Sequence, residues 1–172
     1  MRFLSTLFVL AISSPLSAQA NDWAGISVTC QGSATASARD IACGSQFSCT
    51  TLPVTCLRGD TVSYFVMGQL NGFYALLGTV DIAGLGCVNL GVPGLVNSLI
   101  LPGGSLVPLA VGVCSVPDNG RCNGGASPFT LAFTIPAALP PGALALQAVA
   151  SCPWSGGGNG LAFTRAVEVI YN

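Results

Sequence analysis

The chain has no histidine and no lysine, and charged side chains make up only 6% of its 172 residues. Without histidine, the Ser-His-Asp and Cys-His nucleophile systems and His-ligated zinc sites are excluded in their usual form. Without lysine, Ser-Lys hydrolysis and Schiff-base chemistry are excluded too. These absences remove most classes of enzyme, and we expect a non-enzymatic protein with no cofactor and no metal.

Positive charge is equally scarce, because arginine supplies all five basic residues and the formal net charge is −1. No stretch gathers the arginines into a basic patch. Nucleic-acid binding needs such a patch to neutralise phosphates. We therefore expect no nucleic-acid partner, and binding to anionic membrane surfaces is disfavoured for the same reason.

The sequence has no uninterrupted apolar run long enough for a transmembrane helix of about 20 residues. Residues 82–117 and 122–164 carry no charge, but glycines and prolines break every candidate helix. The prolines that interrupt these stretches include Pro93, Pro102, Pro108, Pro136, Pro140 and Pro141. We predict no membrane span.

The first twenty residues have the pattern of a secretory signal peptide. Arg2 precedes the apolar run Phe3–Ile12, Pro15 breaks it, and Ala18-Gln19-Ala20 matches an A-x-A cleavage site. We predict cleavage near Ala20 and a secreted, extracellular or periplasmic, mature chain. Residues 21–172 would form a single β-sandwich domain with a Cys-rich N-terminal segment, 21–59.

All the cysteines lie beyond this signal, and their even number, eight, predicts four disulfides in an exported chain. They are Cys30, Cys43, Cys49, Cys56, Cys87, Cys114, Cys122 and Cys152. Metal binding competes weakly, because no C-x-x-C spacing is present. The spacing does not determine the connectivity; Cys114–Cys122 is the favoured pair, and the four cysteines from Cys30 to Cys56 could pair among themselves.

Alternation of apolar and polar side chains predicts strands and no long helix. The C-terminal segments 143–150 and 165–171 form a predicted hairpin. Thr61–Leu70 is the strongest central strand, with both faces buried, and Asn71-Gly72 is typical of a tight hairpin turn into Phe73–Val80.

Three more strands are expected at Leu95–Leu101, Leu106–Val113 and Phe129–Ile135. Val107, Leu109, Val111 and Val113 would share one face of the second of these, and Pro108 indicates that it is an edge strand. About seven or eight short strands favour an all-β fold, an antiparallel β-sandwich of Ig-like or jelly-roll-like type stapled by disulfides. A small β-barrel is the alternative.

Several short motifs carry a family resemblance. They are Gly59-Asp60-Thr61, Gly86-Cys87, Leu144-Ala-Leu-Gln147-Ala148 and Thr164-Arg-Ala-Val-Glu-Val169. Over residues 59–172 the chain resembles small secreted bacterial all-β domains of unknown function that end in L-x-L-Q-A … S-N-A-V-x-V. It departs from them at Arg165, where asparagine is usual, and in the Cys-rich segment 30–56. The resemblance implies an extracellular β-sandwich and no reaction.

A pair of carboxylates is the catalytic machinery that the composition still permits, since glycoside hydrolysis needs only two facing acids. The candidates are Asp22, Asp40, Asp60, Asp81, Asp118 and Glu168. Each also has a structural explanation in a turn or on a solvent face. The oxygen-rich loop 118–125 lacks the alternating acids of a calcium site, and two Asn-Gly turns explain it better.

Three functions remain. Near absence of charge and apolar strands favour a structural or surface-assembly protein that associates with itself or with another extracellular protein. A carbohydrate- or protein-binding module would use end loops, with Trp154, Asn159, Asp118 and Asn119 in contact with a glycan or protein. A hydrolase with two carboxylates is the least favoured of the three.

Overall fold

The computed structural model describes residues 24–32, 36–40, 49–88, 90, 95–96, 99–117, 124–127, 131–153 and 159–172. These residues form strands joined by turns, with one short 3-10 helix, η1 (Gly103–Ser105). The strands are β1 (Gly25–Gln31), β2 (Ala36–Asp40), β3 (Leu52–Cys56), β4 (Thr61–Gln69), β5 (Phe73–Thr79), β6 (Leu95–Val96), β7 (Val107–Val113), β8 (Val116–Pro117), β9 (Gly124–Ala126), β10 (Leu131–Thr134), β11 (Gly142–Pro153), β12 (Asn159–Phe163) and β13 (Val167–Tyr171).

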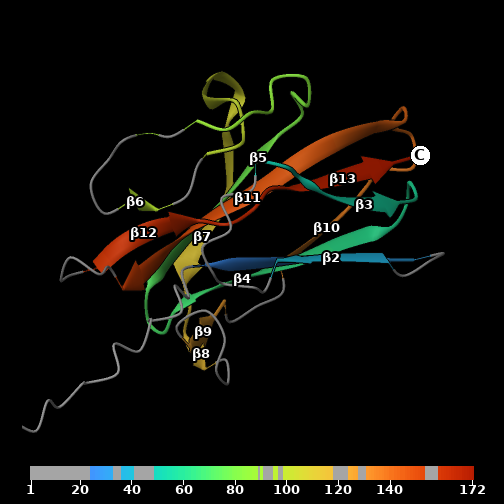
Figure 1. Ribbon diagram of the computed structural model, residues 1–172. Helices are drawn as coiled ribbons and strands as arrows, with labels where there is room; N and C mark the ends of the chain where they lie inside the picture. The colour runs from blue at the N-terminus through green and yellow to red at the C-terminus, as the bar shows by residue number, and fades with distance from the viewer. Residues whose placement is uncertain are drawn as a thin grey trace, which may run out of the picture.

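The strands make two sheets that pack as an open sandwich, as predicted (Figure 1). The first sheet has the order β2-β1-β4-β9-β8, and β10 also pairs with β4. The second has the order β3-β13-β11-β12-β6, while β5 pairs with β11 and β7 pairs with β5. Neighbours are antiparallel except for two parallel pairs, β13 with β3 and β12 with β6.

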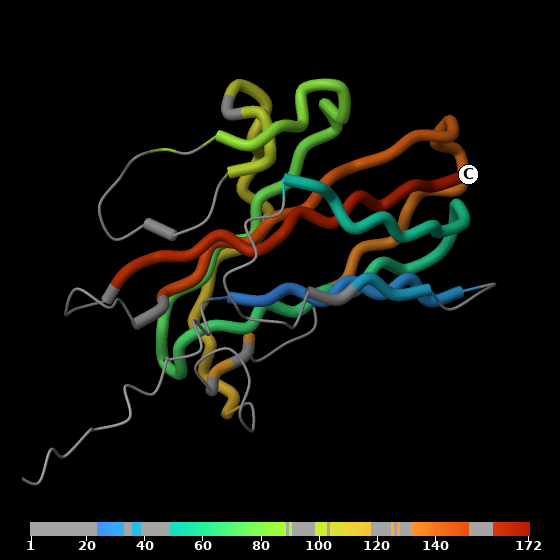
Figure 2. Tube along the Cα trace, viewed as in Figure 1, coloured from blue at the N-terminus to red at the C-terminus, as the bar shows by residue number. Residues whose placement is uncertain are grey.

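β11 organises the second sheet because its length lets it pair with three strands. Its first half pairs with β13, its second half with β12, and its opposite side with β5. The inward side chains of Leu146, Ala148 and Ala150 are fully buried. The pairing predicted for the C-terminal segments is therefore confirmed, and β12 is a further strand between them. Figure 2 shows the C-terminal strand β13 running beside β11 and β3.

β4 holds the corresponding place in the first sheet, and the prediction that both its faces are buried is confirmed. Val62 and Val66 face the core and are fully buried, while Met67 on the other face is 1% exposed. The strand is covered at its edges by β1 on one side and by β10 and β9 on the other.

The predicted hairpin at Asn71-Gly72 is wrong in one respect. Asn71 has a φ of 61°, as such a turn requires, and the Gly72 N–H donates to the Gln69 carbonyl at 2.8 Å. However, β4 and β5 lie in different sheets. After the turn the Phe73 N–H donates to the Ser151 hydroxyl at 3.0 Å, and the chain joins β11 instead of returning along β4.

β7 is an edge strand, as Pro108 predicted, but its four large apolar residues do not share one face. Leu76 pairs with Ala110 and Leu77 with Pro108, so Leu109 is an extra residue in a β-bulge. A Cβ placed on Gly78 would lie 2.7 Å from Leu109 Cδ1 and 3.5 Å from the buried Leu146, so Leu109 points inward.

The N-terminal part is an integral part of the sandwich. β1 lies between β2 and β4, and Ile26, Val28 and Cys30 are fully buried in the main core. A disulfide joins Cys30 to Cys56 in β3, and thus one sheet to the other. This part of the chain therefore contributes to the same apolar core as the later strands.

The disulfide predictions are only partly correct. Besides Cys30–Cys56, a bridge joins Cys49 to Cys87. The expected Cys114–Cys122 bridge is wrong, because Cys114 carries a free thiol and is 0% exposed. Cys114 follows the inward-facing Gly112 of β7, and its Sγ lies near Gly68 and Ala150, so it points into the core. With Cys114 free, the eight cysteines form at most three bridges within one chain.

Other predictions fall outside the described part of the chain. These concern the signal peptide 1–20, Cys43 and Cys122, while Cys152 is described only by its backbone in β11, opposite Gly160. Within the described residues, no helix has the length and hydrophobicity needed to cross a membrane.

Candidate functional site

The sequence predicted a binding site in the end loops, and most of its residues lie outside the described part of the chain. Trp154, Asp118 and Asn119 lie outside the described residues. Asn159 begins β12 opposite Pro153, and only its backbone is described.

The described acids each make a separate structural hydrogen bond. Asp60, 4% exposed, accepts from the Leu57 N–H at 2.9 Å in the turn before β4. Asp81 accepts from the Gly84 N–H at 3.2 Å in a turn after β5. Glu168 on β13 accepts from the Thr51 hydroxyl at 3.1 Å.

The side chains of the remaining three acids are not among the described parts of the structure. Asp22 and Asp118 lie outside the described residues, and the backbone of Asp40 ends β2. Among the described residues, no three histidine, cysteine or acidic side chains are close enough to hold a metal ion. The features that stand out instead are apolar: a strand edge and a cavity.

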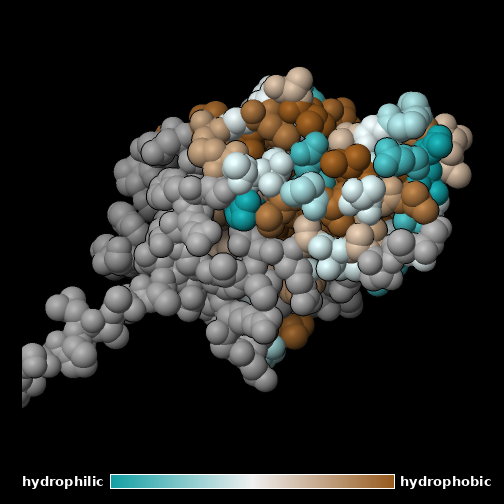
Figure 3. Space-filling model, turned by 45° about the vertical axis from the view of Figure 1, so that its right-hand side comes forward, coloured by the Kyte–Doolittle hydropathy of each residue, from teal (hydrophilic) through white to brown (hydrophobic). Residues whose placement is uncertain are grey.

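The strand edge is β7, which among the described strands pairs only with β5. Val111 is 66% exposed, and Val113 and its neighbour in register, Phe73, are both 45% exposed. Gly112 faces the buried Tyr74 ring, so the two valines project from the outer face. We call Phe73, Val111 and Val113 the edge patch. Apolar residues, in brown, cover much of the described part of the face shown in Figure 3.

The backbone of this edge also points outward. The Cys114 N–H donates to the Gly72 carbonyl at 2.8 Å, and hydrogen-bonded residues alternate along an antiparallel pair. Val111 and Val113 therefore direct their backbone groups away from β5. The Val113 carbonyl accepts from the Ser115 N–H at 2.9 Å, which leaves both Val111 groups and the Val113 N–H facing outward.

The cavity lies between the sheets, on the side opposite the Cys30–Cys56 bridge. β10 ends one sheet there and β7 ends the other, and between them is a space of about 530 Å³ open to solvent. Tyr64 and Phe133 line it from the first sheet, and Leu109, Gly78 and Leu144 from the second. Its volume is in the range of small-molecule sites.

The described lining is almost entirely apolar and contains no charged residue. Its side-chain polar groups are three hydroxyls. Thr79 and Ser105 hydrogen-bond to each other at 2.9 Å, and the Thr79 oxygen also accepts from the Asp81 N–H at 3.0 Å. The Tyr64 hydroxyl differs: Tyr64 is 6% exposed, and no hydrogen bond joins it to any described residue.

Burial keeps this hydroxyl protonated. Desolvation raises the pKa of Tyr64 above 10.0, and the nearby Tyr74 raises it further. Burial also raises the pKa of Tyr74, with a smaller effect of Cys114. The thiol of Cys114, buried in the same way, has its pKa raised to about 11. The Tyr64 hydroxyl is protonated near neutral pH and can donate a hydrogen bond.

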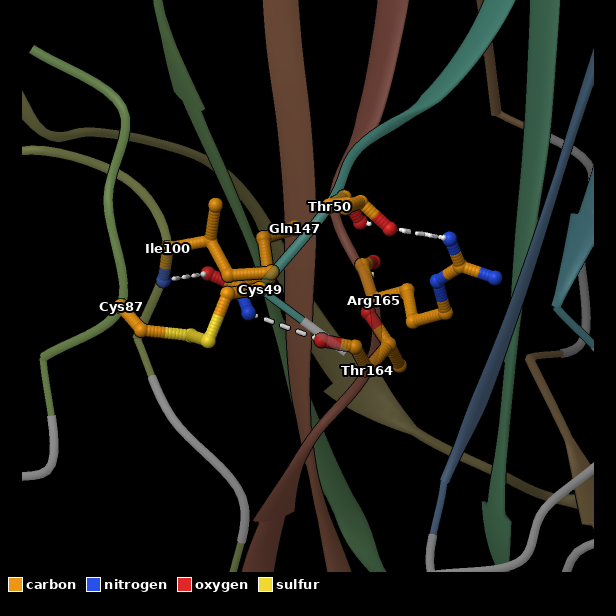
Figure 4. The surroundings of a disulfide bond; sticks show 7 residues. All are labelled: Cys49, Thr50, Cys87, Ile100, Gln147, Thr164 and Arg165. Carbon is orange, nitrogen blue, oxygen red and sulfur yellow. Dashed lines mark hydrogen bonds between the residues drawn. A yellow bond between two sulfur atoms is a disulfide. The ribbon is translucent and has the colours of Figure 1, made fainter. Parts of the chain in front are cut away.

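A buried glutamine on the other face of β11, away from the cavity, holds residues 99–101 against the second sheet (Figure 4). Gln147, 0% exposed on β11, accepts from the Ile100 N–H at 2.9 Å and donates to the Thr164 carbonyl at 2.8 Å. The Cys49–Cys87 disulfide lies beside it, and Arg165 donates to Thr50 nearby. These contacts attach residues 99–101 to the second sheet.

The sequence held only part of the information about this site. The alternation of Thr61–Leu70 places Tyr64 on the same face as Val62 and Val66, and the structure confirms that face as buried. The bulge that turns Leu109 into the cavity had one signal, Pro108, because proline is tolerated in strands at edges and bulges. The opening between β7 and β10 depends on which strands end each sheet, and the strand pattern does not specify that.

No protein-family model matches the chain, and no curated protein matches it.

Proposed function

We propose that this protein is a non-enzymatic extracellular assembly protein that associates with a second copy of itself through the edge of β7. The observation that supports this is the uncharged edge at Val111 and Val113, which among the described strands pairs only with β5 and has exposed apolar side chains on its outer face. An unpaired edge is a template for pairing with another strand.

Protection of the edge is confined to one half of β7. Natural edge strands avoid association through charges, proline, bulges or short length. Pro108 and the bulge at Leu109 protect the first half. Ala110–Val113 has neither feature, and residues 82–117 contain no charge.

A second copy is the partner that this edge fits best. A two-fold axis would place β7 antiparallel to β7 of the other copy, so each Val111 meets an identical apolar strand. Like charges commonly oppose such pairing, but residues 82–117, which include β7, contain no charge in either copy. Phe73 adjoins Val113 in register and would extend the apolar contact on the outer face.

Sedimentation velocity over a range of protein concentrations tests the proposal. We expect a concentration-dependent dimer or larger species, and Val111→Lys should shift the protein to monomer. Leu139→Lys is the matched control, since Leu139 is a 39% exposed apolar residue in the turn after β10. A wild-type protein that stays monomeric at high concentration would refute the proposal, as would equal effects of the two lysines.

A further inference from the structure

We propose that the cavity between β7 and β10 binds a neutral, apolar small molecule that carries one hydrogen-bond acceptor, and that the Tyr64 hydroxyl donates to this acceptor. The inference is independent of the proposed self-association, because the edge patch lies on the outer face of β7 and the cavity on its inner face.

The shape of the cavity follows from how the sandwich is closed. Cys30–Cys56 ties β1 to β3 and holds the sheets together on one side. On the other side β7 and β10 belong to different sheets and do not pair with each other. The inner faces of both sheets are accessible there, so a molecule can enter without any change of pairing.

Two features of β5 and β7 shape the wall of the cavity. Gly78 has no side chain, and a Cβ there would come within 2.7 Å of Leu109 Cδ1, so only glycine permits the present position of Leu109. The bulge then directs Leu109 to the inner side together with Val107, which also lines the cavity. In a regular strand, side chains two residues apart share a face, so Val107 and Leu109 would lie on the outer face with Val111 and Val113. The bulge turns both of them toward the cavity instead.

The lining determines the chemical class of the ligand. Among the described residues, no arginine, aspartate or glutamate lines the cavity, so a charged group would lose its hydration without gaining a counter-charge there. Water in the cavity has few polar partners, which makes its displacement by an apolar body favourable. A fatty acid or a phosphate ester is therefore a poor fit, and a neutral ketone, ester or ether is a good one.

Tyr64 supplies the specific contact. The Tyr64 side chain lines the cavity, and its hydroxyl makes no hydrogen bond to any described residue, whereas Thr79 and Ser105 bond to each other. The hydroxyl is therefore available to donate to a molecule in the cavity. A ligand carbonyl or ether oxygen would satisfy it, and the second wall, formed by Phe133 of β10, would hold the apolar part of the ligand.

Fluorescence titration with two neutral probes tests this inference on the full mature chain, at a concentration where it is monomeric. Prodan has a ketone acceptor, and pyrene has none. We expect saturable binding of both, and Tyr64→Phe should weaken prodan about fivefold, the value of one net hydrogen bond, without changing pyrene. Tyr74→Phe is the matched control, since Tyr74 is buried nearby but does not line the cavity, and it should leave both affinities unchanged.

Variants that fill the cavity complete the test. Leu109→Trp from β7 and Ala132→Phe from β10 should each abolish binding of both probes, while Val111→Lys on the outer face should not. Circular dichroism identifies any variant that does not fold, and the other filling variant then serves. The inference is overturned if neither probe binds saturably, if filling the cavity leaves binding intact, or if Tyr64→Phe weakens pyrene as much as prodan.

Discussion

The side-chain oxygen of Gln147, on β11 of the second sheet, accepts a hydrogen bond from the backbone N–H of Ile100 at 2.9 Å. The amide nitrogen of the same side chain donates to the Thr164 carbonyl at 2.8 Å. Gln147 is 0% exposed, and Ile100 is 2% exposed. One glutamine therefore satisfies two buried backbone groups from segments that no strand ladder joins.

Replacing this glutamine should be costly. Gln147→Leu keeps an apolar side chain in the core but leaves the Ile100 N–H and the Thr164 carbonyl without partners. Each buried unsatisfied group costs about 1–3 kcal/mol, so the two groups together should lower the free energy of unfolding in urea by about 2–6 kcal/mol. Gln31→Leu, at an exposed glutamine at the end of β1, should change it by less than about 0.5 kcal/mol. Equal effects at the two positions would contradict this role.

The two described disulfides should differ in their contribution to stability, although their loops are similar. Their sequence separations are 26 and 38 residues, for which loop closure predicts about 3.5 and 4 kcal/mol. Cys30 and Cys56 are 0% and 2% exposed, whereas Cys49 and Cys87 are exposed. Removing the buried bridge also opens a cavity in the core.

We therefore expect Cys30→Ala/Cys56→Ala to destabilise the protein by at least about 1 kcal/mol more than Cys49→Ala/Cys87→Ala, from the added cavity. Urea unfolding of the two double variants measures the difference. Mild reduction followed by mass mapping should show the exposed bridge opening first. A larger loss from the exposed pair would mean that loop closure dominates.

The alternation of apolar and polar residues predicted several strands of this fold. Alternation located β4, β5, β7, β10 and β11, because each strand has one face on the core and such faces have a period of two. It placed Tyr64 with Val62 and Val66 correctly. Local turn chemistry also placed the bend at Asn71, whose side chain tolerates a positive φ.

What alternation cannot specify is the partner of each strand. β4 and β5 are joined by a short turn, yet they belong to different sheets, and β5 pairs with β11. The pairing of the cysteines was equally ambiguous from the sequence. Proximity in sequence favoured Cys114–Cys122, but Cys114 falls on the inner face set by β7 and is buried without a partner. The cavity depends on the same unpredicted pairing.

The number of thiols follows from Cys114. Disulfides consume cysteines in pairs, so a monomer with eight cysteines and a free Cys114 has at least one further thiol. We expect a thiol reagent to find two thiols per chain in denaturant without reductant. In the native protein Cys114 should react slowly because it is 0% exposed. No thiol in denaturant would contradict this, and an odd number would indicate a disulfide between two chains.

Alkaline pH should destabilise the protein through Cys114. Burial raises the pKa of its thiol from 9.0 to about 11, so the folded state holds its proton more tightly than the unfolded state. The resulting stability is fully present below pH 9, where both states are protonated, and is lost as the pH rises through 11. A shift of this size corresponds to at most about 3 kcal/mol.

Urea unfolding at pH 8 and pH 11, compared between the wild type and Cys114→Ala, measures this loss. The variant is less stable at pH 8 because it leaves a small cavity, at a cost of about 1–2 kcal/mol, but its stability should fall less with pH. Tyr64 and Tyr74, whose pKa values are also raised by burial, titrate in both proteins. Cys114 also raises the pKa of Tyr74, so this smaller effect is part of the loss that the comparison assigns to Cys114. If the two proteins lost equal stability between these pH values, the Cys114 thiol would not be buried in the folded protein in solution.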